Sequence, residues 1–314
     1  HMKAGATVMG CREFLIAYNI NLNTKDHRLA TDIAFELREA GRSKRTPNPN
    51  SKNLLDGEIV RNEDGSPVKV PGMFKDVKGI GWYVDIYNRA QISINFNNFK
   101  VSTIHDVFDA ACILANERGI RVTGSELVGL IPLEAMLMAG RHYLNKQNRS
   151  LGVPTADIVE CAVQSLGLND VTEFDPNVKI IDYAVQFEDR PLMNLVGKEF
   201  VEELSTNSPA PGGGSVSALA GALGAALSSM VAALSHEKKE LLDLKPEMSE
   251  IGIEAQKLKD RLSFLVDEDT NAFNKVMDAN RLSATNDEEQ TAKNQAIEIA
   301  NKYAIEIPME TAKK

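Results

Sequence analysis

The pattern of hydrophobic and polar positions divides the chain into a first part with strand and helix periodicities and a second part with helix periodicity alone. Residues 12–22 alternate apolar and polar side chains, the period of a strand with one buried face. The elements predicted in the first part are a strand at 12–22, a helix at 25–40, strands at 78–87 and 90–99, a helix at 103–118 and a strand at 120–127. This order predicts a ferredoxin-like antiparallel α/β sandwich, with two helices on one face of a four-stranded sheet.

Local signals set the expected ends of these elements. Thr24 is expected to cap the first helix and Thr103 to begin the second, and Gly41 and Gly119 end them. Residues 46–75 are rich in Pro, Asn, Gly and Asp and predict an excursion from the core, with a hairpin turn at residues 62–65. After the sheet, the pattern predicts helices at 133–146 and 155–166 and a short element at 180–185.

From about residue 195 the pattern is helical throughout. The predicted helices lie at 194–204, 215–234, 247–280 and 287–313. We expect Pro308 to interrupt the end of the last one. The fold class is therefore α+β, a ferredoxin-like sandwich followed by an all-α helical bundle. The expected boundaries are 3–186 for the first domain, 187–194 for a linker and 195–314 for the bundle.

The segment 216–234 is uncharged and dominated by small residues. It is about long enough to span a bilayer. Its Ala, Gly and Ser content makes it only weakly hydrophobic, and no second span accompanies it. We therefore expect a buried bundle helix and no membrane partner.

Charge and cysteine content narrow the functional classes. A net charge of −9 argues against a general nucleic-acid surface. Cys11, Cys112 and Cys161 lie far apart in the sequence, which favours a reducing, cytoplasmic compartment and no metal cluster. The histidines lack HxxxH or ExxH spacing, so surface or capping roles are expected and a metal site is not. These histidines are His27, His105, His142 and His236.

A glycine-rich loop precedes the small-residue helix. Residues 208–215 read SPAPGGGS, and the helix that follows would point its free N–H groups at this loop, which attracts anions. The loop is not a P-loop, because no lysine follows the glycines, and a Rossmann loop would need a preceding strand. Two interpretations remain open, an anion-binding helix start and a tight helix–helix connection.

Residues 264–273, FLVDEDTNAF, hold the strongest acid–base candidates. On a helix Asp267 shares a face with Phe264 and Asn271, whereas Asp269 lies on another face. A carboxylate near the core could be desolvated and act as a general acid or base, although a solvated acidic patch explains the same spacing. In the first domain, residues 79–82 and 124–129 bring glycines to strand ends, where either a ligand approaches the backbone or a turn forms.

At these residues the chain resembles the bifunctional formiminotransferase-cyclodeaminases. The segments GATVMGCREFLIAYNINL (5–22), KGIGW (78–82) and TGSELVGLIPL (123–133) resemble the second subdomain of the transferase half. The segment SPAPGGGSVSALAGALGAALSSM (208–230), with residues 264–273, resembles the opening of the cyclodeaminase half.

The resemblance implies a folate enzyme of histidine degradation. It would transfer a formimino group from N-formimino-L-glutamate to tetrahydrofolate, polyglutamylated forms included, and then close 5-formimino-tetrahydrofolate to 5,10-methenyl-tetrahydrofolate with release of ammonia. No metal is implied, and a homo-oligomer is expected. Asp269 aligns with the family's acidic residue and is the expected acid–base group, with Asp267 as second choice. The implied folate contacts are Asn19, Asn21, Gly81, Trp82, Ser125 and Glu126, and in the bundle Gly212, Gly213, Gly214 and Ser215.

The chain also departs from the family pattern. The family's first transferase subdomain, which carries its catalytic histidine, and its closing cyclodeaminase helices have no counterpart here. His1-Met2 is typical of a cloning scar. We therefore expect a fragment of a longer protein with little or no activity of its own. The alternatives are a non-catalytic folate-binding or assembly module and a methenyl-tetrahydrofolate cyclohydrolase-like protein.

Overall fold

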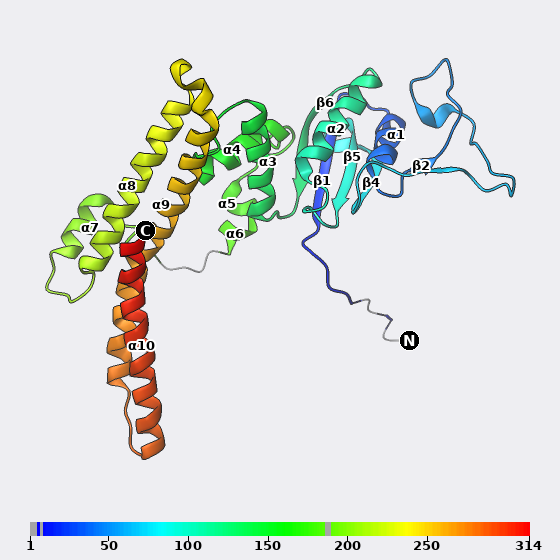
Figure 1. Ribbon diagram of the computed structural model, residues 1–314. Helices are drawn as coiled ribbons and strands as arrows, with labels where there is room; N and C mark the ends of the chain where they lie inside the picture. The colour runs from blue at the N-terminus through cyan, green and yellow to red at the C-terminus, as the bar shows by residue number, and fades with distance from the viewer. Residues whose placement is uncertain (1–4, 7–8, 186–189) are drawn as a thin grey trace. The chain divides into compact units, whose positions relative to one another are not determined.

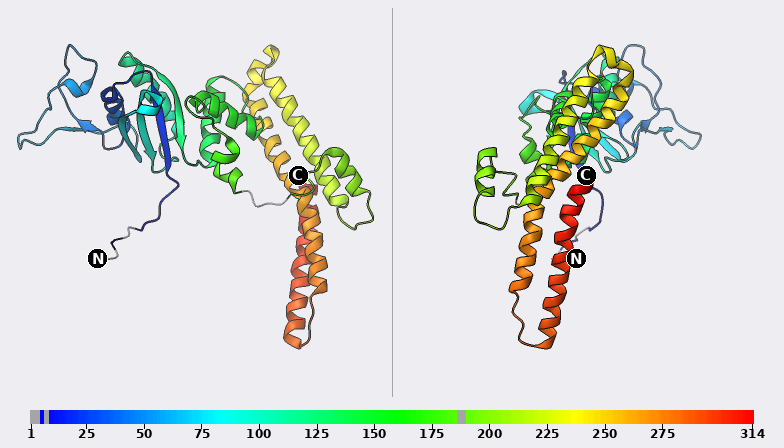
Figure 2. Two further views of the ribbon diagram at one scale, coloured as in Figure 1. Left: turned by 180° about the vertical axis from the view of Figure 1, so that it is seen from behind. Right: turned by 60° about the vertical axis from the view of Figure 1, so that its left-hand side comes forward.

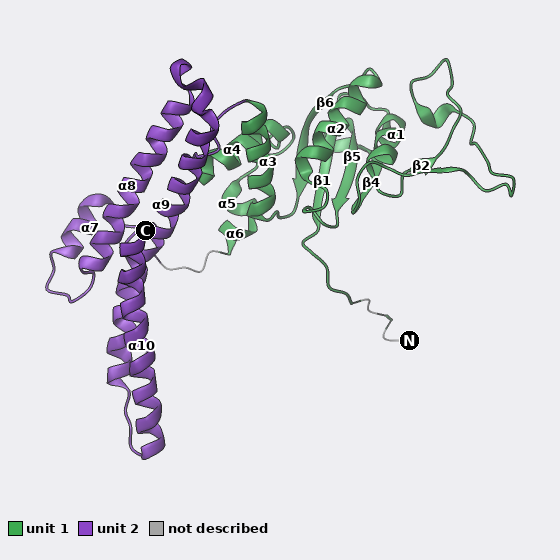
Figure 3. Ribbon diagram, in the orientation of Figure 1, with its two compact units in different colours: residues 1–147, 155–186 green, residues 148–154, 187–314 purple. Residues whose placement is uncertain are grey.

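The computed structural model describes residues 5–6, 9–185 and 190–314, and the chain separates into two compact units. The first unit comprises His1–Gln147 and Thr155–Gln186, and the second comprises Asn148–Pro154 and Phe187–Lys314 (Figure 3). The short segment Asn148–Pro154 thus groups with the helical unit. Residue 186 and residues 187–189 of the expected linker lie outside the described residues.

The first unit contains a four-stranded antiparallel sheet (Figure 1). Its strands are β1 (Ile16–Leu22), β4 (Val77–Val84), β5 (Arg89–Phe96) and β6 (Val122–Val128). The strand order is β4-β5-β1-β6, and each neighbouring pair is antiparallel. With helices α1 (His27–Leu37) and α2 (Ile104–Glu117) between the strands in sequence, this is the predicted ferredoxin-like order.

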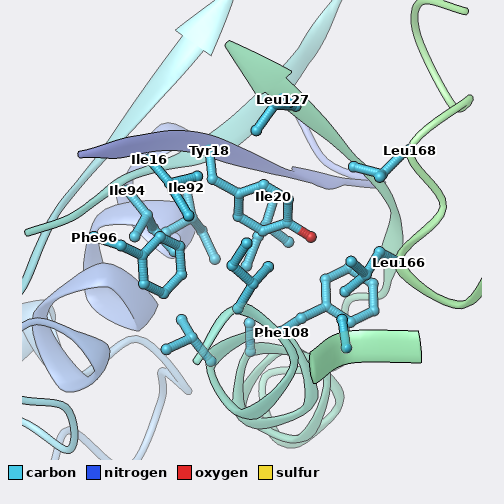
Figure 4. Packing of buried hydrophobic residues seen from close by; sticks show 14 of the residues in the cluster. Ile16, Tyr18, Ile20, Ile92, Ile94, Phe96, Phe108, Leu127, Leu166 and Leu168 are labelled. Atoms are coloured by element: carbon cyan, nitrogen blue, oxygen red, sulfur yellow. The ribbon is translucent and has the colours of Figure 1, made fainter. Parts of the chain in front are cut away.

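The core lies between the sheet and its helices. Tyr18, Ile20 and Phe96 point from their strands toward the helix that carries Phe108 (Figure 4). Side chains alternate between the two faces of a strand, so the residues between these apolar ones face away from the helices. This alternation puts Asn19 and Asn21 on the other face of the sheet.

Helix starts follow the predictions in one case and depart from them in the other. Helix α2 starts at the predicted place, and the Thr103 hydroxyl caps it by accepting from the Asp106 N–H. Asp26, not Thr24, caps α1, and its carboxylate accepts from the Arg28 N–H at 2.8 Å. Thr24 instead accepts from the Asp26 N–H at 3.1 Å, so it fixes the cap from one turn outside the helix.

The excursion between α1 and β4 is ordered by its own hydrogen bonds. It holds β2 (Arg42–Ser43), η1 (Leu54–Asp56) and β3 (Lys69–Val70), and β2 pairs with β3. The Asn62 N–H donates to the Ser66 carbonyl and Gly65 has a φ of 79°, which confirms the hairpin turn. Further on, η2 (Asp85–Tyr87) joins β4 to β5.

The remaining helices of the first unit are α3 (Leu133–Lys146), α4 (Thr155–Leu166), α5 (Pro176–Lys179) and α6 (Ile181–Ala184). The bounds of α3 and α4 equal the predicted ones. The short predicted element at 180–185 corresponds to α6.

The second unit is helical. It contains α7 (Gly197–Leu204), α8 (Gly213–His236), η3 (Lys239–Leu244), α9 (Lys245–Arg281) and α10 (Asp287–Lys313). Helix α8 packs against α9, and α9 and α10 lie side by side as a long hairpin in both views of Figure 2. The core of this unit includes Leu262, Leu265 and Val266 of α9.

Two expectations for this unit are wrong. Helix α10 continues past Pro308 to Lys313, because Ile307 is buried and Arg261 of α9 holds Glu310 through two 2.7 Å hydrogen bonds. These contacts outweigh the one backbone hydrogen bond that proline removes.

Helix α8 is mostly not buried. Only 22% of its most apolar window is buried, since Ala218, Ala222 and Ala232 face the unit while large side chains face away. The exposed large residues of α8 are Val216, Leu223, Leu227, Met230, Val231 and Leu234. By length and composition α8 could also cross a membrane, and a single helix of this kind is weak evidence for one.

Candidate functional sites

The sheet face opposite the helices carries a connected polar network. Directly paired residues of antiparallel strands project from the same face, and Asn21 is paired with Gln91 while Asn19 is paired with Glu126. The Glu126 carboxylate accepts hydrogen bonds from Asn19 Nδ2 at 3.3 Å, from Gln91 Nε2 at 3.2 Å and from the Tyr87 hydroxyl at 2.9 Å. The hydrogen bond to Glu126 raises the pKa of Tyr87. The carboxylate of Glu126 on β6 is therefore hydrogen-bonded to β1, to β5 and to the β4–β5 connection.

A second carboxylate closes the network at the other end. Asp170, which follows α4, accepts from Asn21 Nδ2 at 2.9 Å, from Arg89 Nη1 at 2.8 Å and from the Thr123 hydroxyl at 2.8 Å. Gln91 Nε2 also donates to Asn21 Oδ1 at 2.7 Å, which fixes the orientation of both amides. Gln91 Oε1 has no hydrogen-bond partner among the described residues, and because Gln91 is fully buried this acceptor lies beneath the surface of the sheet face.

Apolar surface adjoins this network on the same face. Trp82 is paired with Gln91 across β4 and β5, and its side chain is 44% exposed. Ile80, two residues earlier on the same strand, is also exposed. A flat aromatic side chain next to amide and carboxylate groups suits a flat heterocycle with polar edges.

Two predicted contact residues point to the other face of the sheet. A Cβ built on Gly81 would lie 2.0 Å from the backbone nitrogen of Thr31, so this glycine allows α1 to pack on β4. Ser125 is fully buried, and its hydroxyl donates to the Leu166 carbonyl at 2.7 Å. The structure therefore brings Asn19, Asn21, Trp82 and Glu126 together and excludes Gly81 and Ser125, which have packing roles.

Four members of the network were not anticipated from the sequence: Tyr87, Arg89, Gln91 and Asp170. The sequence did hold a signal for Gln91, since a glutamine between Ala90 and Ile92 requires a hydrogen-bond partner when the strand is buried. No sequence signal indicated Asp170, because its contacts depend on where the chain lies relative to the sheet after α4.

In the helical unit, the glycine loop meets Asp269. The Ser215 N–H at the start of α8 donates to Asp269 Oδ2 at 3.0 Å, and a Cβ built on Gly214 would lie 2.1 Å from Asp269 Oδ1. The Ser215 hydroxyl donates to the Val266 carbonyl at 2.7 Å and is fully buried. The anion at this helix start is therefore the chain's own carboxylate, and glycine at 214 is required because no side chain fits against it.

The other two glycines of the loop have fewer contacts. Gly212 is the N-cap residue of α8 and Gly213 is its first residue. A Cβ built on Gly213 meets no atom of the described chain within 4 Å. This loop thus serves as a helix–helix connection at Gly214 and Ser215, and it remains open to a ligand at Gly213.

Asp267 has a different environment from Asp269. It is 4% exposed, and its two carboxylate oxygens accept from the backbone N–H groups of Leu192 at 2.8 Å and Met193 at 3.2 Å. Both oxygens are used to hold the segment that leads into α7. This geometry fits an anchoring role for Asp267, whereas Asp269 is partly exposed.

Glu268, between them, is a residue that the sequence analysis missed. Its carboxylate accepts a short hydrogen bond from the Tyr303 hydroxyl of α10, and Lys275 Nζ lies 3.4 Å away. Desolvation opposes ionisation of Glu268, but the hydrogen bonds from Tyr303 and Asn271 and the nearby lysine together lower its pKa. The same hydrogen bond raises the pKa of Tyr303 to about 12. A surface hollow of about 530 Å³ lies next to this cluster, lined by Lys275, Ala279, Ala296, Ile299, Ala300 and Tyr303.

An antiparallel sheet with a polar network on one face, followed by a helical unit with a loop-bound carboxylate, defines an α+β protein with two candidate sites. Residues 17–186 match the family model described as "Formiminotransferase domain", and residues 197–314 match the one described as "Formiminotransferase-cyclodeaminase". The chain therefore belongs to the formiminotransferase-cyclodeaminase family.

Curated relatives agree with this assignment. The chain is 40% identical to the formimidoyltransferase-cyclodeaminase of Dictyostelium discoideum over 314 aligned residues, which cover 98% of this chain and 52% of that protein. It is 36% identical to the Gallus gallus protein of the same name, covering 99% of this chain and 53% of the relative. A methenyltetrahydrofolate cyclohydrolase of Methylorubrum extorquens is 34% identical over 110 residues, 35% of this chain and 53% of that protein. The chain spans about half the length of the formimidoyltransferase-cyclodeaminases that it matches.

Proposed function

We propose that this chain belongs to a folate-dependent one-carbon enzyme of histidine degradation. The whole protein transfers the formimino group of N-formimino-L-glutamate to N5 of tetrahydrofolate and then cyclises the product to 5,10-methenyl-tetrahydrofolate. Two family matches support this proposal. The transferase match comes first along the chain and the cyclodeaminase match second, the order in which the name of the relatives gives the two activities. The proposed reaction requires no metal ion.

The polar sheet face is the proposed folate surface of the first unit. A pterin ring offers N–H donors along one edge and a flat face, and these match a carboxylate or amide acceptor beside an aromatic ring. Glu126, which is partly exposed, provides the acceptor, and the exposed Trp82 provides the ring. This combination on one face, with amides already fixed by hydrogen bonds, is the observation that carries the proposal.

Asp269 is the proposed acid–base group of the helical unit. In the ring closure, N10 forms a bond to the formimino carbon, a proton moves from N10 to the leaving amine, and the carbon–nitrogen bond to ammonia breaks. A carboxylate beside the reacting carbon stabilises the cation and carries this proton. The Ser215 N–H fixes one oxygen of Asp269, and Gly214 leaves the space that this carboxylate needs.

Two alternatives follow from specific observations. The match of 110 residues to a methenyltetrahydrofolate cyclohydrolase favours a hydrolytic reaction on a related folate for the helical unit. The exposed apolar face of α8 favours an assembly module that binds folate without turnover. The same face of α8 supports our proposal that the protein forms a homo-oligomer. The three cysteines form no disulfide, which supports a cytoplasmic location. We propose no nucleic-acid partner and no membrane partner.

Calorimetric titration with tetrahydrofolate tests the proposal, comparing its monoglutamate and polyglutamate forms. We expect saturable binding, at least tenfold weaker in Trp82→Ala, while Ile86→Ala provides a matched control because Ile86 is exposed in the β4–β5 connection outside the network. If neither folate binds at millimolar concentration, or if both variants bind equally well, the sheet face is not a folate surface. Release of ammonia from 5-formimino-tetrahydrofolate then separates a cyclodeaminase from the two alternatives.

A further inference from the structure

Helix packing brings together two histidines that are far apart in the sequence. His105 lies at the start of α2 and His142 lies on α3, and their imidazole rings stack with centroids 4.4 Å apart at an interplanar angle of 29°. Sequence spacing gave no indication of this pair. The cluster lies on the helical side of the first unit, so it is separate from the polar network on the opposite sheet face.

A carboxylate joins the pair. Asp106 Oδ1 lies 4.0 Å from His105 Nε2, and the ligand atoms of His105, Asp106 and His142 all lie within 4.8 Å of one another. Around a tetrahedral metal ion with bonds of about 2.0–2.1 Å, ligand atoms are roughly 3.3 Å apart. Binding therefore requires side-chain rotations that draw the ligand atoms together and turn the stacked rings toward one ion. The Asp106 side chain is 53% exposed and has room to rotate.

His105 is suited to ligation by its environment. It is 8% exposed, and its Nδ1 has no hydrogen-bond partner among the described residues. A buried ring nitrogen without a partner is a position that a metal ion or another ligand can satisfy.

His142 is oriented by a second carboxylate. Its Nε2 lies 3.0 Å from Asp109 Oδ2, and Asp109 is itself held by Lys146 Nζ at 2.7 Å and by the Tyr143 hydroxyl at 3.2 Å. When Nε2 donates to a carboxylate, the lone pair is on Nδ1, which is then the metal-binding atom. A carboxylate behind a histidine ligand is a common arrangement in metal sites.

We propose that His105, His142 and Asp106 form a binding site for a divalent transition-metal ion, with Asp109 as the residue that positions His142. Two imidazoles and one carboxylate match Zn²⁺ or Co²⁺, whereas Mg²⁺ and Ca²⁺ prefer oxygen ligands alone. The His142 side chain is 30% exposed, so the ion has access from solvent and water completes its coordination. The bound ion links α2 to α3 and stabilises the first unit.

The test is a titration of the full chain with Zn²⁺ by calorimetry and with Co²⁺ by visible absorption. We expect one ion per chain, a Co²⁺ spectrum of low coordination number, and a melting temperature that rises with Zn²⁺ but not with Mg²⁺. His142→Ala removes this binding, and Asp109→Asn weakens it by about 10–100-fold, the usual effect of losing a ligand's carboxylate partner. His27→Ala is the control, because His27 is an exposed histidine on α1.

Other outcomes overturn the proposal. These are an unchanged affinity in His142→Ala, an equal loss in His27→Ala, or no stoichiometric binding by the unmodified chain. Replacing the buried His105 by Ala could destabilise the fold itself, so this variant is not decisive. His142→Ala and Asp106→Asn change partly exposed side chains and are the decisive variants. Circular dichroism establishes that both variants fold. The titrations contain no folate, so their result is independent of the function proposed above.

Discussion

The backbone N–H of Ser215 at the start of α8 donates to the carboxylate of Asp269 on α9, at 3.0 Å. This single hydrogen bond joins the glycine-rich loop to the residue with the strongest claim to acid–base chemistry in the helical unit. It also brings the loop and the acidic segment, which are far apart in the sequence, into contact. The positive end of the α8 dipole lies against the negative charge of the carboxylate, which stabilises both.

Replacing Asp269 by Asn tests its role in deamination. The Asn oxygen still accepts from the Ser215 N–H, so folding is retained, but the side chain no longer transfers a proton. We expect ammonia release from 5-formimino-tetrahydrofolate by the whole enzyme to fall by about 10²–10⁴-fold. Asp260→Asn is the matched control, because Asp260 is an exposed aspartate on the same helix. Near-normal turnover in Asp269→Asn removes this residue from the mechanism.

The fit of Gly214 against Asp269 leads to a stability prediction. A Cβ at 214 would lie 2.1 Å from Asp269 Oδ1, so Gly214→Ala must displace the carboxylate or the helix start. We expect a loss of about 1–3 kcal/mol in the free energy of unfolding of the helical unit. Urea unfolding followed by circular dichroism measures it.

Gly213→Ala is the control for this prediction. Gly213 is also at the start of α8, but a Cβ there meets no described atom within 4 Å. Alanine at this position restricts the unfolded chain without a clash, so we expect no loss of stability and a gain of up to about 1 kcal/mol. Equal destabilisation by both substitutions contradicts the close approach of Gly214 and Asp269.

For Asp267 we predict a loss of stability, whereas for Asp269 we predict a loss of activity with folding retained. Its two oxygens accept from the Leu192 and Met193 N–H groups in a buried position, so Asp267→Ala leaves two backbone donors without partners. We expect a loss of about 2–5 kcal/mol in the stability of the helical unit, since hydrogen bonds to a charged group contribute about 1.5–3 kcal/mol each. Trp82 is the single tryptophan and lies in the first unit, so its fluorescence reports that unit separately. A variant as stable as the unmodified chain contradicts the anchoring role.

The sequence predicted best the features that depend on neighbouring residues. The bounds of α3 and α4 and the start of α2 next to Thr103 depend on periodicity and local hydrogen bonding, and all agree with the structure. The strand order followed because the β-α-β-β-α-β sequence has few ways to form a sheet with short connections. The cap of α1 was missed by two residues, since Thr24 and Asp26 are both good cap residues and only the fold decides between them.

Features that depend on distant residues could not be predicted in this way. The hydrogen bond from Gln91 to Glu126 requires the register of three strands, and the stack of His105 on His142 requires the packing of α2 against α3. Burial of α8 was predicted wrongly for a related reason. Its small residues indicate close packing on one side, but composition does not say whether a second layer covers Leu227 and Val231 on the other.

The last prediction concerns the pH dependence of the helical unit, through Tyr303 and Glu268. The hydrogen bond to Glu268 raises the pKa of Tyr303 from 10.0 to about 12, so between these two values the unfolded chain loses a proton that the folded chain keeps. Stability is therefore full below pH 10 and falls as the pH rises toward 12. For Glu268 the pKa is lowered, so its contribution is present above about 4.5 and is lost as the pH falls.

Tyr303→Phe removes both effects. The variant has no hydroxyl to donate to Glu268, so we expect the stability of the helical unit to be lower at neutral pH and to depend less on pH at both ends. Tyr83→Phe, a change of the same kind in the first unit, leaves the Tyr303–Glu268 contact intact and should keep the full pH dependence. Urea unfolding by circular dichroism from pH 3.5 to pH 11.5 measures the difference. Parallel curves for Tyr303→Phe and the unmodified chain would mean that the hydroxyl and the carboxylate are not coupled in solution.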